Sequence, residues 1–244
     1  MKSHATSQRS GQGPRRRRVP LLLAVALAAL GCHATPLQRH SRPQEPVRFA
    51  VLSDPHLYDR RLGDSGQAFE DCVKQDPKLL RESEAILDAA IEGMVQQRVR
   101  FVMICGDLTK AGELQSHVLM TRYLARLERR GLQVYVVPGN HDINNPEAVA
   151  YEGDTTRQVE RVSPQLFRDL YDRFGYGQAI AEDAHSLSYV AQPAHGLWLL
   201  AIDSCKYQES ETRDVHMISG RISPETMAWI QGVMQQAHAS GKRV

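Results

Sequence analysis

The sequence predicts an α/β fold in which a largely parallel β-sheet is flanked by helices. Apolar runs with the β-branched composition of buried strands alternate with segments whose apolar residues recur every three or four positions. Such alternation is typical of βαβ units with right-handed crossovers. The length of 244 residues is sufficient for one large domain of this kind.

Three apolar runs are predicted to form buried parallel strands: residues 47–52, 101–105 and 134–137. The segments between them, residues 79–95 and 113–130, have the 3.6-residue spacing of amphipathic helices. Residues 58–76 are rich in Asp, Gly and Gln and show no sustained period, so we expect an irregular excursion there.

The pattern is looser after residue 143. We expect a polar loop, a helix opened by Ser163-Pro164, an antiparallel strand pair, a second loop and a last helix opened by Ser223-Pro224. The polar loop is assigned to residues 144–158 and the first of these helices to residues 163–174. The strand pair is assigned to residues 187–190 and 197–202, the second loop to residues 203–222 and the last helix to residues 223–238. Residues 242–244 look like the opening of another strand, and we therefore expect the domain to be C-terminally incomplete.

The first 32 residues are typical of an export signal. The basic run at residues 15–18 precedes 12 apolar residues, too few to span a bilayer comfortably, and then Gly31-Cys32. This ending resembles the bacterial lipoprotein signal, which implies that Cys32 is lipidated and that the protein is exported to the periplasmic face of a bacterial membrane. A plain secretory signal and a single anchoring helix are the alternatives. Residues 33–46 contain three prolines and are interpreted as a tether, so the domain itself is assigned to residues 47–244.

The charge balance gives no support for nucleic-acid binding. The formal net charge is +2, but six basic residues precede residue 32, and 24 basic against 28 acidic residues remain after it. Cys105 is interpreted as a small buried residue, whereas the sequence leaves open whether Cys72 and Cys205 pair after export. The oligomeric state is not predicted.

Polar side chains follow each of the three predicted parallel strands: Asp54 and His56, then Asp107, then Asn140, His141 and Asp142. Ligands of open α/β sheets bind beyond the carboxyl ends of the strands, where these side chains would project. If the backbone stays extended, Asp54 and His56 lie on the same side and can hold one cation. Asp107 has two oxygens and can bridge to a second cation, to which Asn140 would supply a neutral oxygen. Two cations about 3.5–4 Å apart can stabilise both the attacking and the leaving oxygen of an in-line displacement at phosphorus.

Asp-x-His, Gly-Asp and Gly-Asn-His-Asp, in this order and each after an apolar strand, resemble the motifs of the calcineurin-like metallophosphoesterases. The resemblance covers residues 47–244 and implies a sandwich of two mixed β-sheets flanked by helices. It implies hydrolysis of a phosphorylated small molecule or phosphodiester by a metal-bound hydroxide, with two divalent ions (Mn, Fe or Zn) as cofactors.

By this resemblance Asp54 and His56 bind the first metal, Asp107 bridges, and Asn140 binds the second. His141 would lie beside the leaving oxygen as an acid or charge stabiliser, oriented by Asp142. Thr109 and Glu113 are candidates for supporting roles.

The chain departs from the family in lacking the family's later metal-binding histidines. His185, His195, His216 and His238 are interpreted as surface or capping residues rather than substitute ligands. Lys110 occupies the position of the metal-binding tyrosine of purple acid phosphatases, which disfavours an iron–tyrosinate centre. We therefore expect little activity from these 244 residues alone, and the alternative function is a non-catalytic metal- or phosphate-binding remnant of such a domain.

Each polar strand end also has a structural explanation. Asp54 could close an Asx turn before Pro55, and Asp107 could cap the following helix. Residues 139–142 could form an ordinary polar turn. An adhesion or scaffold domain would leave all three strand ends unexplained. Asp203 also follows a predicted strand but matches no motif, and we expect it to be structural.

Overall fold

A computed structural model describes residues 46–244. The described residues belong to the second of two compact units, Glu45–Val244. The expected signal, Cys32 and all of the expected tether but its last residue lie outside the described residues. Among the described helices, none combines the length and the apolar composition needed to cross a membrane.

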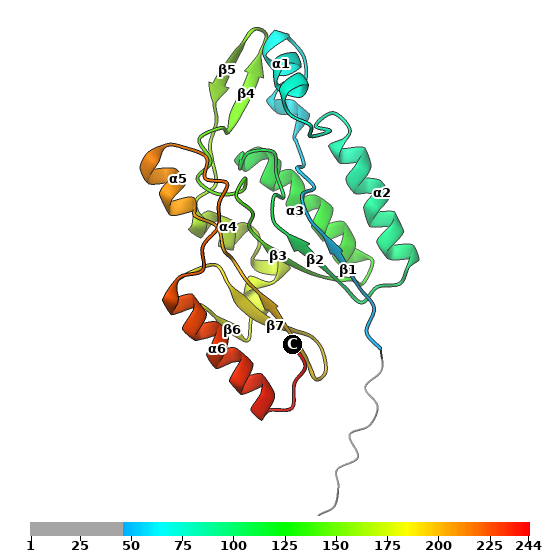
Figure 1. Cartoon of the computed structure of the whole chain (residues 1–244). Helices are drawn as coiled ribbons and strands as arrows, with labels where there is room; N and C mark the ends of the chain where they lie inside the picture. Colours follow the sequence, from blue (N-terminus) through cyan, green and yellow to red (C-terminus); the bar gives the residue numbers. More distant parts are fainter. Residues whose placement is uncertain (1–45) are drawn as a thin grey trace, which may run out of the picture. The chain divides into compact units, whose positions relative to one another are not determined.

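The centre of the fold is the predicted parallel sheet. Its strands are β1 (Phe49–Leu52), β2 (Phe101–Cys105) and β3 (Gln133–Val137), in the order β1-β2-β3. Both strand pairs are parallel, as predicted, with Phe101 opposite Phe49 and Gln133. Helix α2 (Ser83–Gln96) joins β1 to β2, and helix α3 (Leu114–Arg129) joins β2 to β3 (Figure 1). The sheet thus brings the carboxyl ends of all three strands to one edge.

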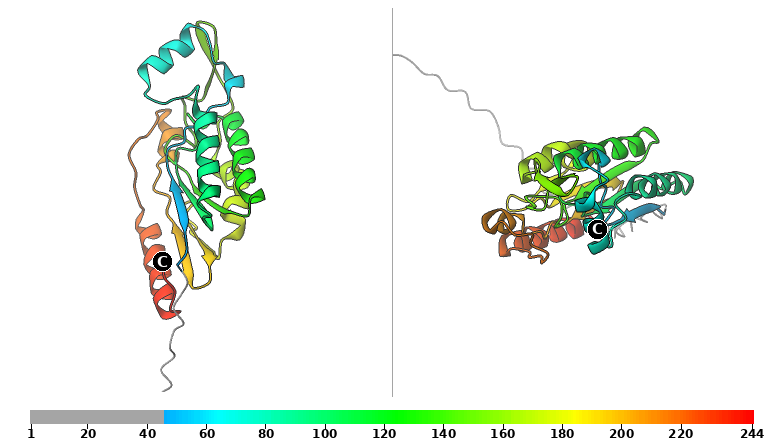
Figure 2. Two further views of the ribbon diagram at one scale, coloured as in Figure 1. Left: turned by 90° about the vertical axis from the view of Figure 1, so that its right-hand side faces the viewer. Right: turned by 90° about the horizontal axis from the view of Figure 1, so that it is seen from above.

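A second sheet faces the first. It contains β6 (Ala181–Glu182), β7 (Tyr189–Ala194) and β8 (Leu197–Ala201), all antiparallel to their neighbours. The Tyr189 hydroxyl donates a 3.0 Å hydrogen bond to the Val136 carbonyl and so links the two sheets. Helix α6 (Pro224–Ala239) lies on the opposite side of the strands from α2 and α3 (Figure 2). The predicted α/β sandwich is therefore confirmed, and Arg243 makes a parallel bridge to Leu197 where a further strand was expected to open.

The N-caps at Ser163 and Ser223 are confirmed. The Ser163 side chain accepts a hydrogen bond from the Leu166 amide at the start of α4 (Pro164–Leu170), which is followed by the 3-10 turns η2 (Asp172–Phe174) and η3 (Tyr176–Gln178). Ser223 accepts from the Thr226 amide at the start of α6. Helix α5 (Tyr207–Arg213) lies in a segment expected to be a loop.

Two other segments expected to be irregular or loops are ordered. Residues 58–76 contain the 3-10 turn η1 (Arg60–Leu62) and helix α1 (Gln67–Gln75). Residues 144–158 contain the hairpin formed by β4 (Val149–Glu152) and β5 (Thr155–Gln158). The two segments share a small core, in which Phe69 packs edge-on against Tyr151 at 5.2 Å between ring centroids. Their order depends on this tertiary contact, which no local period of either segment reveals.

The expectations of burial at β1 and Cys105 were wrong. Strand β1 is an edge strand, with neighbours on one side only, and Phe49 and Val51 are more than half exposed. Cys105 ends β2 and is exposed, because it lines a cavity at the carboxyl edge of the sheet. Cys72, Cys105 and Cys205 are all free thiols.

Candidate metal centre

The loops that follow β1, β2 and β3 are hydrogen-bonded to one another. The Asp54 amide donates to the Gly106 carbonyl at 3.2 Å, and the His56 amide donates to the Asp107 carbonyl at 3.0 Å. The His141 amide donates to Asp107 Oδ1, also at 3.0 Å. The parallel sheet and these three bonds bring the polar side chains of all three strand ends to the same edge.

Asp54, His56 and Asp107 form a cluster suited to a cation. One donor atom from each lies within 4.8 Å of the other two, with His56 Nε2 3.9 Å from Asp54 Oδ1 and 3.7 Å from Asp107 Oδ2. With these three separations, a point equidistant from the three donor atoms lies about 2.4 Å from each of them. This distance is close to the ~2.0–2.6 Å of bonds between divalent cations and their ligands. Two carboxylates and an imidazole are also the donor types that Mn, Fe and Zn accept. The residues therefore fit a divalent cation.

The expected geometry of Asp54 and His56 was wrong, although both side chains do meet. We expected an extended backbone, but φ is 55° at Asp54 and 40° at His56, and it is 49° at Asp107. All three residues are in the left-handed region, which costs a non-glycine residue about 1–2 kcal/mol. The side chains converge because the chain turns sharply after each strand, not because alternate residues of a strand share a face.

His56 is oriented by its second ring nitrogen. Nδ1 donates to the Thr109 carbonyl at 3.3 Å, which leaves Nε2 directed at the two carboxylates. Burial lowers the pKa of His56 and raises the pKa of Asp107. A neutral imidazole whose other nitrogen is held by a carbonyl is the form in which histidine binds metals. Thr109, a candidate for a supporting role, thus contacts the cluster through its backbone carbonyl.

Two glycines allow the loops after β2 and β3 to touch. A Cβ on Gly139 would lie 2.1 Å from both the amide nitrogen and Oδ1 of Asp107. A Cβ on Gly106, where φ is +81°, would lie 2.8 Å from the Gly139 Cα. Asp107 can therefore take its place in the cluster only when residue 139 has no side chain.

Asn140 and His141 lie beside this cluster. Asn140, Asp54 and Asp107 line one cavity of about 480 Å³, and the His56 and His141 rings are edge-to-face at 4.9 Å. His141 Nδ1 is buried and has no hydrogen-bond partner among the described residues. Burial, with Lys78 and His216 nearby, lowers the pKa of His141 to about 3, so its imidazole is neutral at pH 7.

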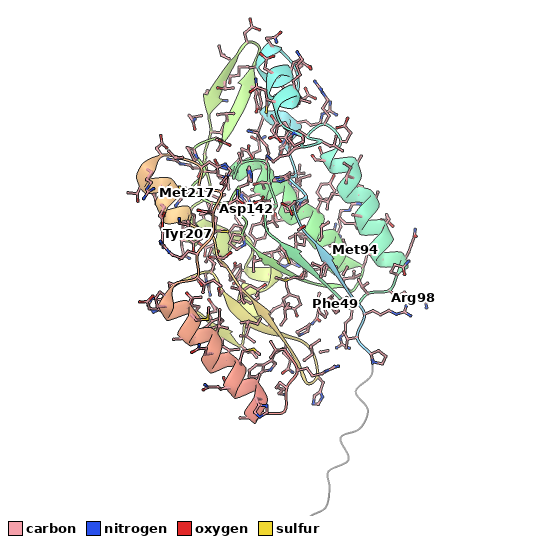
Figure 3. The ribbon with its side chains drawn as sticks, viewed as in Figure 1. Phe49, Met94, Arg98, Asp142, Tyr207 and Met217 are labelled. Carbon is pink, nitrogen blue, oxygen red and sulfur yellow. The ribbon has the colours of Figure 1, made fainter. Side chains whose placement is uncertain are left out.

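The expectation that Asp142 orients His141 was wrong. Asp142 is completely buried, and its carboxylate accepts hydrogen bonds from the backbone amides of Leu108, Thr109 and Gly139. Burial raises the pKa of Asp142 to about 7. No hydrogen bond joins this carboxylate to the His141 ring, and Asp142 instead ties the loop after β3 to the loop after β2. Figure 3 labels Asp142 above the strand ends.

Other expectations for supporting residues can be compared directly. Asp203 is structural as expected, because its oxygens accept from the Leu187 and Cys205 amides and the Tyr207 hydroxyl. Glu113 is buried, and one of its oxygens accepts from the Ala111 amide. It makes no contact with the cluster.

Two residues near the site were missed in the sequence. His216 was interpreted as a surface or capping residue, but its side chain is 10% exposed and it contacts Asn140, 76 positions away in the chain. The Lys78 ammonium lies near His56 and His141 and opposes their protonation. Neither residue belongs to a motif or to a strand end, so no signal in the sequence identifies them. His185, His195 and His238 are not members of the cluster.

Fold and cluster together define an α/β protein with a candidate cation site at the carboxyl ends of its parallel strands. The family model for calcineurin-like phosphoesterases matches residues 47–207, and the chain belongs to this family of metal-dependent phosphoester hydrolases. No curated protein matches the chain in sequence. A solved dimetal phosphatase from Danio rerio is similar to it, with 16% identity and a TM-score of 0.49 over 81% of this chain and 68% of that one.

Proposed function

We propose that this phosphoesterase works with two divalent cations, of Mn, Fe or Zn, on a phosphodiester or phosphomonoester. The observation that carries the proposal is the convergence of Asp54, His56 and Asp107 within 4.8 Å at the strand ends of a family member. When bound, the cations supply Lewis acidity to the oxygens of the phosphoester.

Each residue of the cluster has a distinct part in this proposal. Asp54 and His56 Nε2 would hold the first cation. Asp107, whose Oδ2 faces His56, would contribute to both cations, and Asn140 would contribute an amide oxygen to the second. The His141 amide donates to Asp107 Oδ1 and fixes the rotation of the bridging carboxylate.

His141 is the residue proposed to act on the leaving group. Its neutral ring lies 4.9 Å from His56 and can donate a hydrogen bond toward an oxygen held at the cluster. Lys78, which is paired with Asp76 at 2.9 Å, lines a cavity together with Asp54 and His56, and its positive charge favours an anionic substrate. Asp142, which is buried and bonded to backbone amides of both loops, is proposed to position the loops and not to contact the substrate.

Metal binding is the direct test of the proposed function. We expect the 244-residue chain to bind two equivalents of Mn²⁺ in isothermal titration calorimetry, and Asp107→Asn to bind fewer than one. The matched control is Asp154→Asn, which alters an exposed aspartate in the β4–β5 turn. One equivalent or fewer for the unmodified chain would favour the metal-binding remnant instead.

Turnover is expected to be weak. Within residues 46–244, His56 is the one imidazole in the three-residue cluster, so the first cation would be held by few ligands. We expect little or no hydrolysis of bis(p-nitrophenyl) phosphate with Mn²⁺. Robust turnover that Asp107→Asn abolishes would overturn this expectation while supporting the assignment of Asp107.

A further inference from the structure

His216 is placed against the site by a segment that is hydrogen-bonded to helix α5. It follows helix α5, and the Met217 amide donates to Ser210 Oγ at 3.2 Å while the Val215 amide donates to the Ser210 carbonyl at 3.3 Å. Asn144 Nδ2, in the loop after β3, donates to Glu211 Oε2 at 3.1 Å and ties α5 to the site. Met217, the next residue, is labelled in Figure 3.

The His216 ring is held between Glu147 and Asn140. Nδ1 lies 3.5 Å from Glu147 Oε2, and Nε2 accepts a hydrogen bond from Asn140 Nδ2 at 2.9 Å. The ring also packs against the His141 ring, with 4.3 Å between centroids. A carboxylate on one nitrogen of a buried histidine is the arrangement that directs the other nitrogen at a metal.

The separation between His216 and Asn140 matches that of two ligands on one ion. Two donors each about 2.1 Å from an ion and 90° apart lie about 3.0 Å from one another. The observed 2.9 Å becomes a nitrogen–oxygen pair when the Asn140 amide turns over and presents Oδ1.

Asn140 is also next to Asp107. Its two chain neighbours both touch Asp107: the His141 amide bonds to Oδ1, and the Gly139 Cα is close enough that a Cβ there would collide with the same oxygen. Asn140 and the imidazole that contacts it are therefore adjacent to the carboxylate proposed to bridge.

We propose that His216 Nε2 is a ligand of the second cation, together with Asn140 Oδ1 and Asp107 Oδ1, and that Glu147 positions its ring. This inference rests on the proposed two-cation function and adds to it a ligand from the segment after α5. It replaces the interpretation of His216 as a surface or capping histidine.

The test compares Mn²⁺ binding of the full chain with that of His216→Ala and His216→Gln. We expect both variants to keep the tighter site within threefold and to lose at least tenfold in affinity at the second site. The electron paramagnetic resonance signal of a coupled Mn²⁺ pair should be replaced by that of an isolated ion. His195→Ala, which removes an exposed histidine, should keep both sites and the coupled signal.

Three outcomes separate this inference from the proposed function. Two unchanged sites in both His216 variants would overturn the role of His216 and leave the two-cation proposal standing. One site or none in the unmodified chain would overturn both. His216→Gln keeps a side chain that can bond to Asn140, so loss of the second site in this variant, with an unchanged melting temperature, attributes the effect to the imidazole.

Discussion

Replacing Gly139 by alanine tests whether the contact between the loops after β2 and β3 holds the metal centre together. The new Cβ would lie 2.1 Å from the amide nitrogen and Oδ1 of Asp107, whereas ordinary contacts are 3.4–4 Å. Asp107 must therefore move by about 1 Å or more, and overpacking of this kind costs about 1–3 kcal/mol. Alanine also lowers the conformational entropy of the unfolded chain relative to glycine, which stabilises the folded protein by about 0.4–1 kcal/mol. We expect a net loss of about 1 kcal/mol, or roughly 2–4 °C in melting temperature for a domain of this size.

The assay is thermal unfolding with and without Mn²⁺, together with calorimetric titration of Mn²⁺. Because Asp107 is displaced, Gly139→Ala should also bind Mn²⁺ at least tenfold more weakly and gain less melting temperature from it. The matched control is Gly93→Ala in α2, where nothing lies within 4 Å of the added Cβ and the helix should gain about 1 kcal/mol. A Gly139→Ala variant that melts within 1 °C of the unmodified chain, or that binds Mn²⁺ equally well, would refute the reasoning.

Two further predictions concern His117 and Cys32. Burial lowers the pKa of His117 from 6.5 to about 4 in the folded protein. Between these pH values His117 is protonated in the unfolded chain but neutral in the folded one. The free energy of unfolding should therefore fall by up to about 3 kcal/mol as the pH falls from about 6.5 to about 4. Urea unfolding should show that the free energy of unfolding falls less between pH 7 and pH 4.5 in His117→Gln than in the unmodified protein. An equal fall in the two proteins would contradict the attribution of this pH dependence to His117. Cys32→Ser, expressed in a bacterium with its own leader, should move the protein from the membrane fraction to the soluble fraction. Retention in the membrane fraction would argue for an anchoring helix instead of a lipid.

The parallel sheet and its polar edge could be predicted because their signals are local. Strands β2 and β3 are continuous apolar runs, and the helices between the strands have an amphipathic period. Parallel strands must present their carboxyl ends at one edge, so Asp54, His56 and Asp107 could be placed together before any coordinates were known.

The rest of the site depends on contacts that sequence spacing does not encode. His216 reaches Asn140 only because α5 is tied to the loop after β3, and α5 itself was expected to be a loop. The role of Asp142 was misjudged because a carboxylate next to a histidine in the chain need not face it, and here it turns inward to three backbone amides. Helix α1 and the β4–β5 hairpin are ordered by each other.

The left-handed backbone at Asp54, His56 and Asp107 bears on why these residues are present. Glycine adopts this conformation freely, and selection for folding alone would favour it at all three positions. A chain that had lost its chemistry could drift to glycine there and become more stable. Under the proposed function, these three polar side chains supply their donor atoms at a cost in stability that the rest of the fold must carry.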